Sequence, residues 1–315
     1  MNKLQSCVFS ALLAMFSLTA WADHDGKKER DHELRMVVTA AFVSETGIPI
    51  YKEIGEYLGR KLKRRVSVVS SLGYGDADKL LGHGIVQVGF VCGLPYIHKA
   101  AEGKYALVAI PVSATRSGRF ADARWGYENT PGKYFSYTIV RKDSPFKRWE
   151  DIRGKRYAYN DIYSNSGYNM PRYKLVQLGA KSWEDYFSRV VVSGSHEESI
   201  RLVASGKVDA SSVDSFVLDF ERARGNLEAL NVRIIEQLFE RGAGAPPVVV
   251  GSQVDPALRL ALQEALIGMH KDPAGRKILD KALLLRFDPP DDANYDDIRA
   301  MEAAARKAGF IDHAE

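Results

Sequence analysis

The sequence predicts an α/β protein made of two blocks of similar construction. Short β-branched runs alternate with amphipathic helical stretches, which is the pattern of βα units around mainly parallel sheets. An Arg-, Gly- and Asp-rich segment at residues 114–133 interrupts this alternation, which resumes after it. The chain has 315 residues, enough for about two domains at roughly 150 residues each.

Composition excludes several other classes of protein. Apolar residues make up 45% of the chain and charged residues 27%, which is ordinary for a globular protein and excludes collagen-like and disordered chains. Two cysteines are too few for a disulfide scaffold. The formal net charge of +4 is too small to indicate a nucleic-acid partner by itself.

Residues 1–22 have the features of a secretory signal peptide. Lys3 supplies the positive start, residues 8–20 form the apolar stretch, and Ala20-Trp21-Ala22 resembles a cleavage site. The apolar stretch is shorter than the roughly 20 residues of a spanning helix, so cleavage is favoured over a membrane anchor. Cys7 leaves with the leader, and Cys92 alone cannot form an intramolecular disulfide. We therefore expect an exported chain that meets no nucleic acid.

The first block follows a polar, aperiodic lead-in at residues 23–34, which we expect to be flexible. Its predicted strands cover residues 35–41, 66–70, 86–91 and 106–112. After the first strand, apolar residues recur four apart from Ile50 to Leu62, and Pro49 suits the first turn of the helix that this spacing predicts. Further helices are predicted at residues 76–81 and from Leu94 onward.

The second block repeats this order. Its predicted strands cover residues 134–141, 156–160, 190–193, 209–213 and 232–237, with helices near 168–178 and 195–205. The Gly/Pro stretch at 242–247 indicates a crossing back to the first block, and it precedes a strand at 248–251 and a helical pattern over 256–308. We expect lobe 1 to comprise residues 35–136 and 242–315, with lobe 2, residues 137–241, inserted between them.

One polar segment joins a strand to a helix at residues 163–168. Ser164 and Ser166 supply hydroxyls, Asn165 an amide, and Gly167 permits close approach. Backbone N–H groups at a helix start have no partner within the helix, so this segment is a candidate anion site. Ordinary N-capping by Ser or Asn is the alternative interpretation.

Two further segments follow the next strands of the same block. Ser195 and Glu198 have capping-box spacing, which places His196 in a first helical turn as a donor to an anion or as an exposed histidine. Asp214 ends the following strand and is either an N-cap or an acceptor facing a cleft. Because open α/β sheets bind ligands beyond the carboxyl ends of their strands, the convergence of the three segments favours one ligand site.

The order of these segments resembles the periplasmic phosphate/phosphite/phosphonate-binding proteins of ABC importers. An Ile-Arg-Gly-Lys turn at 152–155 precedes Ser-Asn-Ser-Gly at 164–167, and a His-containing helix leads to a strand that ends in an acid. The pattern DPAGRKIL…NYDDIRAM near the C-terminus also fits, so the resemblance spans residues 35–310. It implies a two-lobe type II periplasmic binding protein, with two mainly parallel sheets flanked by helices and a ligand cleft between the lobes.

The resemblance also implies roles for individual residues. It assigns the oxyanion oxygens to Ser164, Asn165 and Ser166, a donated hydrogen bond to His196, and an acceptor for a protonated P–OH to Asp214. From lobe 1, Tyr74 and Tyr96 would reach across, with plain aromatic packing as the alternative for each. It implies no cofactor, no metal, a small anionic ligand, a monomer and an inner-membrane permease as partner. The anion stays open among phosphate, phosphite, small phosphonates and a more distant anion.

An enzyme is the competing class, because Ser166, His196 and Asp214 could be drawn as a hydrolytic triad. The sequence has no G-x-S-x-G elbow, no metal-spaced His/Cys cluster and no P-loop, so binding is favoured over catalysis. A periplasmic sensor that presents its closed lobes to a signalling receptor would need the same cleft. We also expect Asp214 to reject sulfate, which carries no proton near neutral pH.

Overall fold

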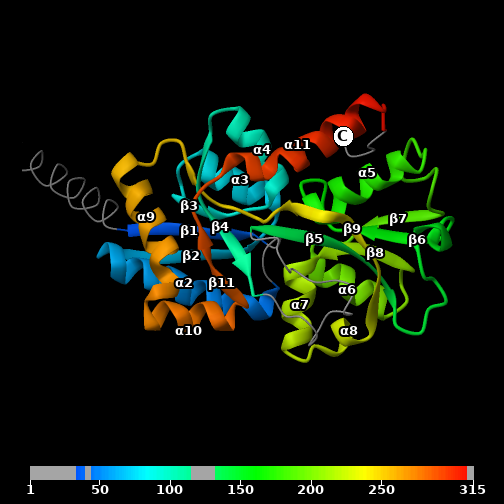
Figure 1. Ribbon diagram of the computed structural model, residues 1–315, viewed down its shortest axis with the longest axis horizontal. Helices are drawn as coiled ribbons and strands as arrows, with labels where there is room; N and C mark the ends of the chain where they lie inside the picture. The colour runs from blue at the N-terminus through cyan, green and yellow to red at the C-terminus, as the bar shows by residue number, and fades with distance from the viewer. Residues whose placement is uncertain (1–32, 40–43, 115–131, 311–315) are drawn as a thin grey trace, which may run out of the picture.

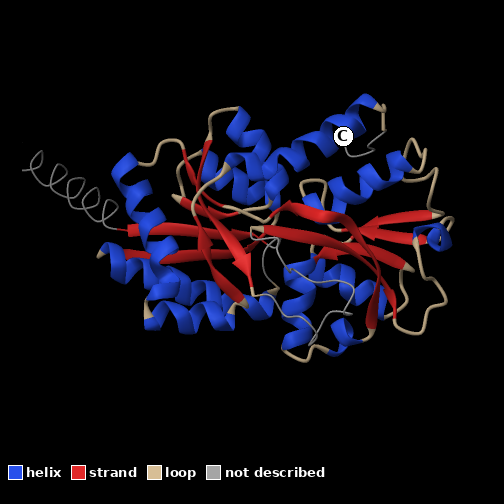
Figure 2. Ribbon diagram, viewed as in Figure 1, coloured by secondary structure: helices blue, strands red, loops and turns tan. Residues whose placement is uncertain are grey.

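The computed structural model describes residues 33–39, 44–114 and 132–310. The predicted leader, most of the lead-in and the interruption at 115–131 lie outside the described residues. The end of the predicted lead-in is corrected, because β1 (Glu33–Thr39) already includes Glu33 and Leu34. Figures 1 and 2 show two α/β lobes side by side, each with a sheet covered by helices.

The first sheet has six strands in the order β11-β4-β10-β3-β1-β2. Their bounds are β1, β2 (Arg65–Leu72), β3 (Val88–Phe90), β4 (Tyr105–Ser113), β10 (Val248–Gly251) and β11 (Leu284–Asp288). Strand β1 pairs in parallel with β2 and β3, whereas β10 lies antiparallel between β3 and β4. A parallel core is therefore extended by strands that return late in the sequence.

The second sheet has five strands in the order β7-β6-β8-β5-β9. Their bounds are β5 (Lys133–Arg141), β6 (Arg156–Tyr159), β7 (Arg189–Val192), β8 (Ala210–Asp214) and β9 (Val232–Gly244). Strands β7, β6 and β8 are parallel, and β5 lies antiparallel between β8 and β9. The carboxyl ends of β6 and β8 therefore meet at one edge, which brings the segments that follow them together.

Helices cover both sheets. In the first half of the chain they are η1 (Glu45–Gly47), α2 (Ile48–Leu62), α3 (Tyr74–Gly82), α4 (Gly93–Ala101) and η2 (Trp149–Ile152). In the second lobe they are η3 (Asn165–Asn169), α5 (Met170–Gln177), α6 (His196–Ala204), α7 (Ser215–Ala223) and α8 (Leu227–Leu230). The C-terminal set is α9 (Pro256–Gly268), η4 (Met269–Lys271), α10 (Pro273–Lys281), η5 (Asp292–Tyr295) and α11 (Asp296–Lys307).

Local sequence accounts for several of these boundaries. Pro49 lies at the second position of α2, where its missing N–H costs no hydrogen bond. Ser195 caps α6 by accepting a hydrogen bond from the Glu198 N–H, and Gly206 ends the turn beyond it with φ of +73°. These two predictions from capping patterns are confirmed.

The prediction of a wholly helical C-terminal region is wrong at residues 284–288. These residues form β11, which pairs antiparallel with the outer edge of β4. The local pattern LLRFD does not distinguish an edge strand from a helix, and the pairing partner lies far away in the sequence. Leu284 and Phe287 are buried on the first sheet as a result.

Three connections join the lobes. Strands β5 and β9 run antiparallel along their length, and the predicted lobe boundaries at 136/137 and 241/242 fall inside them. The third is α11, which packs against α4 of the first lobe and α5 of the second (Figure 1). Phe310, just beyond α11, packs edge-on against Trp183 with ring centroids 5.9 Å apart.

Candidate functional site

The segment after β6 forms a capped helix start that is fully buried. The Ser164 hydroxyl accepts a hydrogen bond from the Gly167 N–H at 3.0 Å, so the capping interpretation is confirmed for this residue. Ser164, Asn165 and Ser166 each have no exposed surface. Their polar atoms therefore depend on partners within the protein or on a ligand.

Gly167 is required by the close approach of Asn160 at the end of β6. A Cβ added at Gly167 would lie 1.8 Å from Asn160 Oδ1 and 3.2 Å from His196 Cε1. No side chain fits such a gap without displacing these two neighbours. The glycine therefore allows the turn after β6 to lie directly against the start of α6.

His196 is a neutral hydrogen-bond donor in this environment. Its Nδ1 accepts the backbone N–H of Asp214 at 3.2 Å, so the ring proton is on Nε2. Burial lowers the pKa of His196 from the ordinary 6.5 to about 3, which keeps the ring uncharged at physiological pH.

The Nε2–H of His196 faces two polar neighbours. The Asn160 amide lies 3.1 Å away and the Ser166 hydroxyl 3.4 Å away. Rotating the Asn160 amide by 180° would turn its oxygen toward the imidazole N–H and toward the Tyr74 hydroxyl, giving both an acceptor. The predicted donor His196 therefore lies with Ser166 in one hydrogen-bonded group.

Asp214 is an N-cap, one of the two roles considered for it. Oδ1 caps α7 by accepting the Phe216 N–H at 2.7 Å, while Oδ2 is buried with no hydrogen-bond partner among the described residues. Burial raises the pKa of Asp214 well above its ordinary value, although the N–H groups at the start of α7 oppose this. A buried carboxyl oxygen without a partner in the protein can accept a hydrogen bond from a bound group.

Two side chains of the first lobe reach this group. The Tyr74 hydroxyl lies 2.8 Å from the Asn160 amide nitrogen, as predicted for a residue that crosses between lobes. The buried Cys92 accepts the Asn165 N–H on its sulfur at 3.2 Å. The starts of α4 and η3 therefore face each other through this sulfur.

Two predicted residues make their hydrogen bonds elsewhere. The Asn165 side chain donates to the Tyr134 hydroxyl at 3.0 Å and accepts from Asn169 at 3.0 Å. Tyr96 is not brought to the group, because its hydroxyl donates to Asp292 at 2.6 Å and its ring packs on Tyr295. The segment Gly-Leu-Pro-Tyr thus directs Tyr96 toward the C-terminal region rather than across the lobes.

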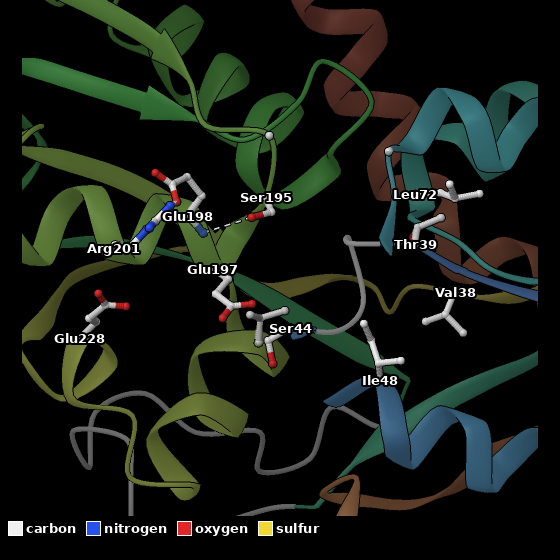
Figure 3. A pocket seen from close by; sticks show the side chains of 13 residues that line it. Val38, Thr39, Ser44, Ile48, Leu72, Ser195, Glu197, Glu198, Arg201 and Glu228 are labelled. Carbon is white, nitrogen blue, oxygen red and sulfur yellow. Dashed lines mark hydrogen bonds and ion pairs between the residues drawn. The ribbon is translucent and has the colours of Figure 1, made fainter. Parts of the chain in front are cut away.

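A pocket of about 520 Å³ lies between the lobes next to this polar group. The first lobe lines it with Val38, Thr39, Ser44, Ile48, Leu72 and Gly73, and the second with Gly194, Ser195, Glu197, Glu198, Arg201, Val217 and Glu228. Figure 3 shows the side chains of the two lobes on opposite walls, with Arg201 paired to Glu198. Gly73 and Ser195 directly precede Tyr74 and His196 in the sequence, but none of the predicted ligand-binding side chains lines this pocket.

The charges of the pocket do not favour an anion. Three glutamates and one arginine line it, and that arginine is already paired.

Within the part of the chain that the structure describes, no group of His, Cys, Asp or Glu side chains could hold a metal ion. No described helix is long and apolar enough to span a membrane.

A family model described as "ABC transporter, phosphonate, periplasmic substrate-binding protein" matches residues 36–295. The chain belongs to this family. The resemblance predicted from the sequence is confirmed, and substrate-binding components of transporters are not an enzyme class.

Solved structures show the same two-lobe fold. A binding protein of an ABC phosphonate transporter from Pseudomonas aeruginosa, PA3383, superposes with a TM-score of 0.74 at 17% identity, covering 88% of this chain and 87% of that one. PhnD1 from Prochlorococcus marinus, in complex with methylphosphonate, gives 0.70 at 16% identity over 89% and 99%. The alkanesulfonate-binding protein SsuA from Xanthomonas axonopodis pv. citri, bound to MOPS, gives 0.59 at 14% over 89% and 95%.

The sequence analysis did not identify Asn160 and Tyr134 as members of the polar group. Asn160 is a polar residue at the carboxyl end of a predicted strand, so the rule that selected Asp214 would also have selected it. Tyr134 lies on the crossing strand β5 and carries no local signal. The partnership of its hydroxyl with Asn165 becomes visible only when β5 is placed beside η3.

Proposed function

We propose that the protein captures a tetrahedral phosphorus oxyanion, a phosphonate, phosphite or phosphate, by closing its lobes and delivers it to an inner-membrane permease. One observation carries this choice of ligand. Asp214 Oδ2 is buried near neutral donors and has no hydrogen-bond partner in the part of the chain that the structure describes, and a protonated oxyanion would supply a donor to it. Family membership supports the transport role.

The binding shell that we propose is electrically neutral apart from Asp214. Ser164 and Ser166 donate through hydroxyls, His196 donates through Nε2, and Tyr74 closes the shell from the first lobe. Asn165 contributes its helix-start backbone rather than its amide, because the amide is occupied by Tyr134 and Asn169. Closure removes water, which strengthens every hydrogen bond to the oxyanion.

The proton between Asp214 and the ligand is the basis of the proposed selectivity. Because burial raises the pKa of Asp214, its carboxyl and the oxyanion compete for one proton and share it in a hydrogen bond. An alkanesulfonate or sulfate brings no proton near neutral pH. Such an anion is accepted only when Asp214 is itself protonated, so discrimination against it increases with pH.

We also propose that the site is not hydrolytic. In a Ser–His–Asp triad the carboxylate accepts from Nδ1–H and Nε2 accepts the serine proton. Here Nδ1 of His196 accepts a backbone N–H, so Nε2 is protonated and cannot act as a base toward Ser166. Export through a cleaved leader, a monomeric state and the absence of a nucleic-acid partner complete the proposal.

A thermal-shift screen followed by calorimetry tests the proposed ligand class. The probes are methylphosphonate, phosphite, phosphate, sulfate and methanesulfonate. A ligand at a hundred times its dissociation constant stabilises the folded chain by about 2.7 kcal/mol. Stabilisation by a phosphorus oxyanion at pH 8 without stabilisation by sulfate or methanesulfonate is expected. A preference for methanesulfonate, or no response to any phosphorus oxyanion, would overturn the assignment.

A further inference from the structure

A buried carboxylate of the second lobe holds the first lobe at a point away from the proposed ligand shell. Glu221 on α7 is only 1% exposed. Its Oε1 accepts hydrogen bonds from the Ser44 hydroxyl and from the Thr46 hydroxyl, the latter at 2.7 Å. Its Oε2 accepts from the Asn226 amide of its own lobe at 2.6 Å. Oε2 thus bonds within the second lobe, and Oε1 bonds across to the first lobe.

Ser44 and Glu221 are buried beside apolar side chains, whereas Thr46 is exposed at the outer side of the contact. Ser44 shares a small cavity with Tyr51 of α2 and with Phe216, Val217 and Phe220 of α7. Hydrogen bonds to an ionised group are stronger than neutral ones, and exclusion of water strengthens them further. The two hydroxyls therefore add an attraction between lobes that does not involve the proposed ligand residues.

The position of the contact gives it leverage over closure. In Figure 1, α7 lies on one side of β5 and β9, and the connecting helix α11 lies on the other. Ser44 and Val217 also line the interlobe pocket, so the contact stands at the rim of that pocket. Separation of the lobes on this side must break the hydrogen bonds of Ser44 and Thr46 to Glu221.

We propose that Glu221, Ser44 and Thr46 form an interlobe latch that stabilises the closed form and slows release of the bound anion. Glu221 is a positioning residue in this role, since it acts through the lobes rather than on the ligand. The latch holds for any anion that closes the lobes. The proposed latch is therefore tested independently of the assignment to phosphorus oxyanions.

The test removes the two donors and leaves the carboxylate in place. In the double variant S44A/T46V, the dissociation rate of methylphosphonate or inorganic phosphate in stopped flow should rise about tenfold, which corresponds to about 1.4 kcal/mol. The association rate should change little. In small-angle scattering, the unliganded variant should have a larger radius of gyration than the unliganded wild type.

The conservative variant T46S keeps the hydroxyl and serves as the matched control. Paired with wild-type Ser44, it should retain the wild-type dissociation rate and radius, whereas T46V alone should move both part of the way. The latch would be overturned if wild type and the double variant had equal radii and equal dissociation rates. Equal radii with no anion bound by either protein would overturn it as well. A fall in melting temperature without a change in radius or rate would also overturn it, by showing a purely local structural role.

Discussion

Replacing Asp214 by Asn isolates the role of one oxygen atom. Asn is as good an N-cap as Asp, so Oδ1 can keep accepting the Phe216 N–H at the start of α7. The shape is retained as well, and only Oδ2 changes, from a proton-sharing oxygen to an amide that can donate but not accept. D214N therefore tests the hydrogen bond to the ligand without dismantling the helix.

The magnitude follows from the burial of this oxygen. A hydrogen bond to a charged group contributes about 1.5–3 kcal/mol, and Oδ2 has no alternative partner among the described residues. The dissociation constants of methylphosphonate and phosphite should therefore rise about 10- to 150-fold in D214N. Sulfate affinity should rise at pH 8, since the buried negative charge that repels sulfate is gone.

Stability should change in the opposite direction to affinity. The pKa of Asp214 is raised in the folded state, so this carboxyl binds more protons in the folded chain than in the unfolded chain, and its contribution to wild-type stability falls as pH rises above the ordinary carboxyl range. In D214N the side chain at position 214 does not titrate, so this loss of stability with rising pH is absent. The unliganded variant should thus be more stable than wild type at pH 7, and the difference should shrink toward pH 4.

Isothermal titration calorimetry and urea unfolding measure the two effects. D255N is the matched control, because Asp255 caps α9 with the same hydrogen-bond pattern on an exposed surface. It should leave both affinities unchanged. Unchanged phosphonate and phosphite affinity in D214N would remove Asp214 from the site, and unchanged sulfate affinity would refute the selectivity argument.

Three further changes test the rest of the polar group. G167A should lower stability and abolish anion binding in calorimetry, because its Cβ would lie 1.8 Å from Asn160 Oδ1. G268A is the control and should be neutral, because a Cβ at Gly268 would have nothing within 4 Å. The contribution of His196 to stability in urea should fall as pH drops below 6.5 toward 3, by at most about 1.4 kcal/mol per pH unit, because the buried neutral ring resists protonation that the unfolded state accepts. H196Q should remove this contribution from the pH profile, and a profile identical to that of wild type would assign the dependence to other groups. Y74F removes one hydroxyl from the lobe interface and should weaken anion binding about tenfold while melting temperature changes little; wild-type affinity would exclude Tyr74 from the shell.

The sequence predicted the fold well because its signals were local. Alternation of strands and helices, Pro49 in the first turn of α2, and the caps at Ser195 and Asp214 all depend on neighbours within a few residues. Strand β11 was missed because its stability comes from pairing with β4, about 170 positions earlier in the chain. Local periodicity contains no information about such a partner.

The sequence predicted which residues lie together at the site better than it predicted how they are arranged. Residues at strand ends were selected correctly as a group, but the tautomer of His196 depends on the backbone of Asp214, which the sequence does not place. Tyr96 illustrates the same limit. Its direction depends on Asp292 and Tyr295, which return from the far end of the chain to occupy it.

The C-terminal helix has a mechanical consequence for ligand capture. Two strands alone form a flexible joint that permits torsion as well as bending. Helix α11 contacts the first lobe near Tyr295 and the second through Phe310 on Trp183, so a relative rotation of the lobes must disturb packing at one of its ends. Its Ile298 carbonyl also accepts from Asn169 in the helix start that faces the proposed anion. Removal of Phe310 together with the end of α11 should therefore alter how the lobes meet, although these residues lie outside the proposed ligand shell.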